Sequence, residues 1–156
     1  MSLVLFTCMV GLLIAPINVD FTYACISLLA VAIGSGAAGT LNMWYESDLD
    51  ALMSRTCLRP IPTGKVKKNQ ALYFGIVLSA LSVSIIYFSA NLISAILLAS
   101  TIAFYFFIYT IWLKRKTPQN IVIGGAAGAL PPVIGWTIAT GSISCLLYTS
   151  PSPRDP

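Results

Sequence analysis

The chain has 156 residues, of which 57% are hydrophobic and only 9% are charged, and its formal net charge is +4. Water-soluble domains are typically about 45–50% apolar and about 25% charged, so the composition excludes a soluble globular protein. No nucleic-acid partner is expected.

Long uncharged stretches dominate the sequence, at residues 21–44, 69–113 and 117–153. A bilayer core about 30 Å thick needs about 20 apolar residues per helix. As one helix, residues 69–113 would be about 68 Å long. We therefore expect this stretch to fold back once, at residues 89–91.

We predict an all-α, polytopic transmembrane helical bundle in which five spans can be placed. The expected spans are residues 3–17, a short first span, then 21–44, 69–89, 92–113 and 119–140. Pro131 and Pro132 lie inside the last one and predict a kink or a break there. Small residues predict close helix packing, at Gly34, Gly36 and Gly39 in the second span and at Gly124 and Gly128 in the fifth.

The basic residues predict the orientation in the membrane. Five of them lie between residues 55 and 68, and three at residues 114–116, two spans later. Both clusters therefore lie on the same face, which the positive-inside rule makes the cytoplasmic or matrix side. No stretch has the composition of a transit peptide, which favours a bacterial plasma membrane over the mitochondrial inner membrane.

One segment at this face combines acidic and amide side chains. Asn42, Glu46 and Asp50 are spaced four residues apart, so on a helix each lies about 40° further round than the last and the three form one polar stripe. Asp48 points about 200° away from Glu46. Two carboxylates and an amide oxygen are ligands that suit Mg²⁺, which also takes phosphate oxygens from a substrate.

Cationic side chains follow the stripe, among them Arg55, Arg59 and Lys65. Arginine binds phosphate through two parallel hydrogen bonds, and lysine acts as a point charge. Carboxylates, a metal and cations together suit a diphosphate leaving group. The alternative is a solvated loop whose charges only follow the positive-inside rule.

Two separate segments carry a resemblance to a known family. LNMWYESDLDALMSRT at residues 41–56 and YTIWLKRKTPQNIVIGGAAGALPPVIGW at residues 109–136 resemble the UbiA superfamily of intramembrane prenyltransferases, specifically its haem-farnesylating members. The resemblance covers residues 1–144. It implies about nine transmembrane helices around a central cavity, with two acidic motifs, so about five of the nine expected spans are present here.

The resemblance implies an enzyme that transfers a farnesyl group from farnesyl diphosphate to a vinyl group of haem B, with Mg²⁺ as cofactor, and so produces haem O. Asn42, Glu46 and Asp50 would be the catalytic and metal-binding residues, although relatives usually have Asp at the position of Glu46. Arg55, Arg59, Lys65, Lys114 and Arg115 would bind substrate, the last two through a haem propionate or the diphosphate. Membrane lipid surrounds such an enzyme, and haem A synthase or terminal oxidase assembly factors would be its protein partners.

Other interpretations stay open at this point. Lys114 and Arg115 also fit a role in topology alone. One alternative is a UbiA-type enzyme with a different acceptor of the prenyl group, such as a quinone precursor. Another is a polytopic membrane protein without enzymatic activity. We expect residues 1–144 to be a partial UbiA-type membrane domain, inactive by itself because the second acidic motif is missing, and residues 145–156 to be a non-native or disordered tail.

Overall fold

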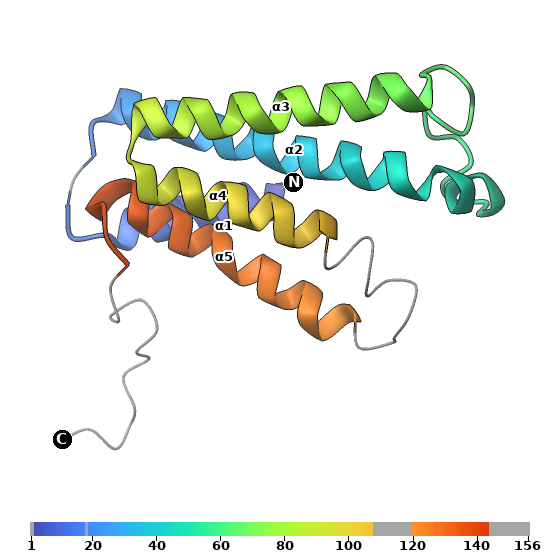
Figure 1. The fold of residues 1–156 in the computed structure, drawn as a ribbon. Coiled ribbons are helices and arrows are strands. Elements are labelled where there is room, and N and C mark those ends of the chain that lie inside the picture. The colour runs from blue at the N-terminus through green and yellow to red at the C-terminus, as the bar shows by residue number, and fades with distance from the viewer. Residues whose placement is uncertain (1, 18, 108–119, 144–156) are drawn as a thin grey trace.

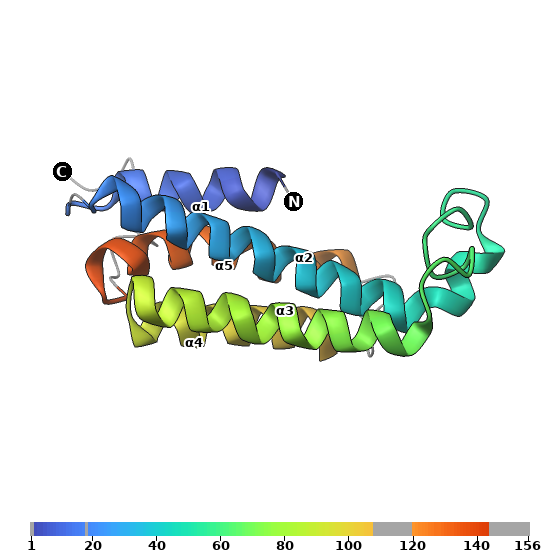
Figure 2. The same ribbon diagram turned by 90° about the horizontal axis from the view of Figure 1, so that it is seen from above.

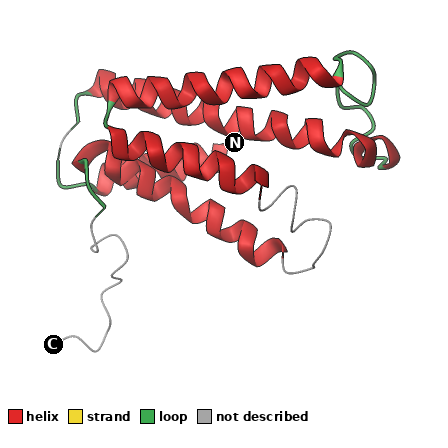
Figure 3. Ribbon diagram, in the orientation of Figure 1, coloured by secondary structure: helices red, strands yellow, loops and turns green. Residues whose placement is uncertain are grey.

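The computed structural model describes residues 2–17, 19–107 and 120–143, and only the backbone of residues 120–127. Within these ranges the chain consists of helices joined by loops and turns, without a strand (Figures 1 and 3). The helices are α1 (Ser2–Ile14), α2 (Phe21–Leu52), α3 (Lys68–Ser89), α4 (Leu92–Ala103) and α5 (Asn120–Thr140). The predicted all-α fold is confirmed, and each predicted span corresponds to one helix.

The bounds of three helices differ from the predicted ones by more than one residue. α1 ends at Ile14, three residues before the predicted end at residue 17. α2 continues to Leu52, eight residues beyond the predicted end at residue 44, because an acidic stripe on one face does not interrupt the backbone hydrogen bonds of a helix. α4 ends at Ala103 and is followed by a π-helical turn at residues 104–107, while residues 108–113 of the predicted span lie outside the described residues.

Polar residues cap the two helices that follow short turns. The side chain of Asp20 accepts a hydrogen bond from the Thr22 amide at the start of α2, and that of Asn91 accepts one from the Ser94 amide at the start of α4. These caps satisfy backbone donors that have no partner within the helix. The turn predicted at residues 89–91 is confirmed, because α3 ends at Ser89 and α4 begins at Leu92.

The helices form two main pairs. α2 packs chiefly against α3, and α1 chiefly against α5, while α4 contacts α3, α5 and α2. Seen from above, α2 runs between α1 and α3 (Figure 2). The core between the helices is made mostly of small and aliphatic side chains: Cys8, Ala30, Val31, Ala38, Ile86, Ala95, Leu98, Ile102, Ile134 and Ile138.

Two glycines allow α1 and α5 to approach closely. A Cβ atom at Gly135 would overlap the carbonyl oxygen of Cys8, and one at Gly11 would overlap that of Pro132. α5 continues through Pro131 and Pro132 as a single helix, so the prolines do not break it. α1 and α5 therefore pack closely both at Pro132 and at Gly135, three residues later.

Among the predicted small-residue contacts, the one at Gly34 is confirmed within the described helices. A Cβ atom at Gly34 would lie 3.1 Å from Ser82 Oγ, so α2 packs tightly on α3 there. Gly39 and Gly128 have nothing within 4 Å of such an atom, so they do not serve close packing between the described helices. Spacing alone does not show which face of a helix meets a neighbour.

A network of polar side chains joins the α3–α4 turn to α5. Asn91 Nδ2 donates to the Thr137 carbonyl oxygen at 2.7 Å, and Ser94 Oγ lies 3.0 Å from Thr137 Oγ1. Ser94 and Thr137 are fully buried. Because buried polar groups are costly without partners, this network fixes α5 against the turn.

The outer surface is apolar over much of its length. α2 and α3 are each long and apolar enough to cross a membrane. On α3, the side chains of Tyr73, Phe74 and Val77 are 72%, 58% and 61% exposed. In a core helix of a soluble protein such large apolar side chains would be buried. The connection between α2 and α3 lies at the same end of the bundle as the end of α4 and the start of α5 (Figure 1).

Candidate active site

The polar stripe lies on the last turns of α2. Asn42, Glu46 and Asp50 all fall within the helix, and four-residue spacing places consecutive members on the same face. Glu46 and Asp50 are only 5% and 4% exposed, which is unusual for carboxylates. Asp48, which was predicted to point elsewhere, is exposed and pairs with Lys68 at 3.4 Å. The carboxylates of Glu46 and Asp50 are thus buried, whereas that of Asp48 is exposed to solvent.

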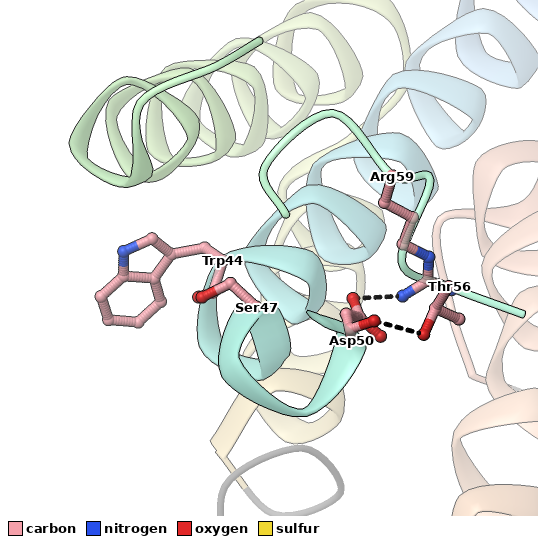
Figure 4. A network of polar contacts seen from close by, with 5 residues as sticks. All are labelled: Trp44, Ser47, Asp50, Thr56 and Arg59. Atoms are coloured by element: carbon pink, nitrogen blue, oxygen red, sulfur yellow. Dashed lines mark hydrogen bonds and ion pairs between the residues drawn. The ribbon is translucent and has the colours of Figure 1, made fainter. Parts of the chain in front are cut away.

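Asp50 is paired with an arginine from the following loop. Arg59 Nη1 donates to Asp50 Oδ2 at 2.7 Å, as Figure 4 shows. This short, charge-assisted contact is partly buried, so it is stronger than an ordinary surface ion pair. The loop containing Arg59 therefore folds back onto the end of α2, where a guanidinium and a carboxylate meet.

Asn42 provides a test of whether the polar stripe is suited to bind a cation. Its Oδ1 atom is buried and has no hydrogen-bond partner in the described part of the chain, although buried amide oxygens in proteins are nearly always bonded. An oxygen in this state, one turn from the buried carboxylate of Glu46, suits a hard cation. The described residues contain no cluster of three or more His, Cys, Asp and Glu side chains. Mg²⁺ does not require one, because it is usually held by one or two carboxylates together with water and substrate phosphates.

The remaining predicted substrate-binding residues fall into two groups. Arg55 and Lys65 lie in the loop between α2 and α3 and are exposed. Lys114 and Arg115 lie outside the described residues. Only Arg59 among these predicted residues is therefore seen in contact with the acidic stripe within the described part of the chain.

Sequence reasoning missed Thr56, whose side chain is 5% exposed. Its Oγ1 donates to the Asp50 carbonyl oxygen at 3.1 Å (Figure 4). The sequence of a polar loop does not show whether a threonine hydroxyl in it is buried or exposed to solvent. The signal that was available is its place between Arg55 and Arg59, just after the end of α2.

An apolar cavity of about 260 Å³ lies between the helices, and its lining includes Ala38 of α2, one turn before Asn42. Its α2 wall includes Val31, Gly34 and Ala38, at the three- and four-residue spacing that leads to Asn42. Residues of α1, α4 and α5 complete the lining, among them Val4, Thr101 and Ile134. The polar stripe and the apolar cavity thus lie along the same helix, one turn apart.

Comparison with known proteins supports the resemblance seen in the sequence. Residues 4–153 match the UbiA prenyltransferase family. The chain belongs to this family. Its membership makes the chain part of an integral membrane protein, in agreement with the apolar surfaces of α2 and α3.

Several relatives of the chain are named protoheme IX farnesyltransferase. The chain is 73% identical to the one from Pelagibacter ubique and 60% identical to the one from Ehrlichia ruminantium, each over 144 residues, or 92% of this chain. It is also 60% identical to the one from Bartonella bacilliformis. The chain spans about half the length of these relatives, from 46% to 49%. No solved structure matches it.

Proposed function

We propose that the complete protein is a prenyltransferase that moves a farnesyl group from farnesyl diphosphate to haem B and so produces haem O. The proposal is supported by the name that the relatives share and by their 73% and 60% identity to this chain. The structural observation that supports it is the polar stripe, in which Glu46 and Asp50 are buried and the buried Oδ1 atom of Asn42 has no hydrogen-bond partner among the described residues. An apolar cavity begins one turn away, at Ala38.

In the proposed transfer, a carbon–carbon bond forms between the first carbon of the farnesyl group and the terminal vinyl carbon of haem B, while the bond from that first carbon to the diphosphate oxygen breaks and its electron pair stays on the oxygen. Water then adds to the other vinyl carbon and loses a proton, which gives the hydroxyl group of haem O. Bound Mg²⁺ would neutralise the charge that grows on the leaving diphosphate. In this proposal Asn42, Glu46 and Asp50 hold the cation. Arg59 is already placed beside Asp50, so it binds the same diphosphate. Arg55 and Lys65 add exposed positive charge on the loop, and Lys114 and Arg115 contact the diphosphate or a haem propionate.

The cavity beneath the stripe would hold the farnesyl chain. Its walls are mostly apolar, with Ser35, Thr101 and Tyr105 as the residues that carry hydroxyl groups, so an isoprenoid tail entering it leaves water without losing hydrogen bonds. The tail then lies along α2 with the diphosphate at Asn42, which places the breaking bond at the boundary between polar and apolar surfaces. This arrangement orients the substrate before the reaction.

We also propose that the protein lies in a bacterial plasma membrane with the stripe at the cytoplasmic face, as the positive-inside rule indicates. In a mitochondrion the corresponding place would be the matrix face of the inner membrane. Haem O would pass from there to haem A synthase or to terminal oxidase assembly.

The test is an assay of farnesyl transfer in membranes that contain the complete protein, with Mg²⁺, farnesyl diphosphate and haem B. We expect haem O to form, and an excess of an aromatic quinone precursor not to compete. Prenylation of the quinone precursor in place of haem would assign a different acceptor. If neither acceptor is prenylated, the enzymatic proposal is wrong.

A further inference from the structure

Thr56 is buried in a loop whose other side chains are largely solvated. It is 5% exposed, whereas Leu58, two residues later, is 84% exposed. Removing a hydroxyl from water is unfavourable unless it forms a hydrogen bond in the protein. The bond that Thr56 forms is specific, because its Oγ1 reaches back to the carbonyl oxygen of Asp50.

That carbonyl needs a donor from outside the helix. α2 ends at Leu52, so the Asp50 carbonyl is one of the last four of the helix and has no partner within it. The Thr56 hydroxyl supplies the donor at 3.1 Å. The Thr56 amide also donates to the Met53 carbonyl at 3.0 Å, which turns the chain back directly after α2.

Thr56 is bonded to Arg59 as well. The Arg59 amide donates to the Thr56 carbonyl oxygen at 3.0 Å. One residue therefore contacts the backbone of both members of the Asp50–Arg59 ion pair, whose side chains meet at 2.7 Å (Figure 4). A β-branched side chain is also restricted about its first torsion, so few other directions are open to the hydroxyl.

We propose that Thr56 is a positioning residue of the candidate diphosphate site. It fixes the start of the α2–α3 loop so that the Arg59 guanidinium faces the Asp50 carboxylate, and it thereby sets the affinity for a magnesium-bound diphosphate. The inference rests on the proposed function of this site. Without the Thr56 contact, diphosphate binding has to order the loop first, which lowers the affinity.

Two variants of the complete protein test this role. Thr56→Val keeps the shape of the side chain and removes the hydroxyl, while Thr56→Ser keeps the hydroxyl. The readouts are the dissociation constant for inorganic diphosphate with Mg²⁺, measured by calorimetry, and amide hydrogen exchange over residues 53–67. We expect Thr56→Val to weaken diphosphate binding about five- to tenfold and to raise exchange by a similar factor, and Thr56→Ser to stay within about twofold of the wild type.

Thr137→Val is the matched control. Thr137 is another fully buried threonine, and its hydroxyl donates to the Ile134 carbonyl at 3.0 Å at the opposite end of the bundle. We expect this variant to lower the melting temperature and to leave the affinity for diphosphate unchanged. Equal losses of affinity in both valine variants would overturn the inference, because the effect would then be one of general stability.

Other outcomes show whether the positioning role of Thr56 or the proposed farnesyl transfer is wrong. The inference is overturned if the wild type does not bind magnesium diphosphate, or if Thr56→Val binds it as tightly as the wild type. If diphosphate binding depends on Thr56 but haem is not farnesylated, the positioning role stands and the proposed reaction fails. In steady-state assays we expect Thr56→Val to raise KM for farnesyl diphosphate more than it lowers kcat.

Discussion

Gly135 of α5 lies directly against the backbone of Cys8 of α1, so that a Cβ atom at position 135 would overlap the Cys8 carbonyl oxygen. Cys8 is fully buried, and α1 has its most extensive interface with α5. This contact joins the first and last described helices of the bundle. It depends on the absence of a side chain at one position.

Gly135→Ala is therefore expected to destabilise the protein by about 2 kcal/mol, because α1 and α5 must move apart to admit a methyl group. The matched control is Gly128→Ala in the same helix, where a Cβ atom would have nothing within 4 Å. We expect this control to be neutral or slightly stabilising, since alanine favours helix more than glycine does. Thermal unfolding of the complete protein in detergent measures both, and equal melting temperatures for the two variants would contradict the close contact.

Asp50 and Asp48 provide a second matched pair. Asp50 is 4% exposed and bonded to Arg59, whereas Asp48 is solvated and only weakly paired with Lys68. We expect Asp50→Asn to lower kcat/KM for farnesyl transfer at least about 100-fold, because it removes a charge proposed to hold the metal. Asp48→Asn should change it by less than about twofold. Similar activities for the two variants would contradict the proposed metal site and would favour the alternative, in which the acidic segment is only a solvated loop.

The cavity leads to a prediction about chain length. Ala38 lines it one turn before Asn42, so Ala38→Leu would fill part of the space proposed for the farnesyl chain. We expect kcat/KM to fall about tenfold or more with farnesyl diphosphate and much less with the shorter geranyl diphosphate. The control is Ala80→Leu, which makes the same change on the exposed side of α3, outside this cavity. It should leave the ratio of kcat/KM for farnesyl diphosphate to that for geranyl diphosphate unchanged. Equal losses with both substrates in Ala38→Leu would show that the chain does not enter the cavity.

Asn91 is expected to stabilise the end of the bundle opposite the acidic stripe. Its amide nitrogen donates to the Thr137 carbonyl, and its Oδ1 accepts from the amide and hydroxyl of Ser94. Asn91→Ala should therefore cost about 2 kcal/mol of stability, because it removes a helix cap and leaves buried polar groups unpaired. Ser84→Ala, at an exposed position on α3, should change stability by less than about 0.5 kcal/mol. Chemical unfolding of the two variants measures their free energies of unfolding. If Asn91→Ala has the same free energy of unfolding as the wild type, the network adds no stability.

Much of the candidate site was predictable, because the spacing of Asn42, Glu46 and Asp50 along one helix is a local property. The ion pair between Asp50 and Arg59 was not, since loop conformation decides which cation meets which carboxylate. Arg55 and Arg59 carry the same charge, yet only Arg59 is seen to form an ion pair with the stripe. Thr56 was missed for a related reason: the composition of a loop does not reveal that one hydroxyl in it is buried.

The sequence by itself determined the all-α class, the order of the helices, the turn between residues 89 and 91 and the family. Each depends on the hydropathy or residue pattern of a continuous segment. Tertiary structure decided that Gly135 rather than Gly128 packs closely, that Ser94 meets Thr137, and that the loop after α2 returns to Asp50. Side chains within a helix lie at fixed angles to one another, whereas contacts between helices depend on how those helices cross and rotate, which no single segment specifies.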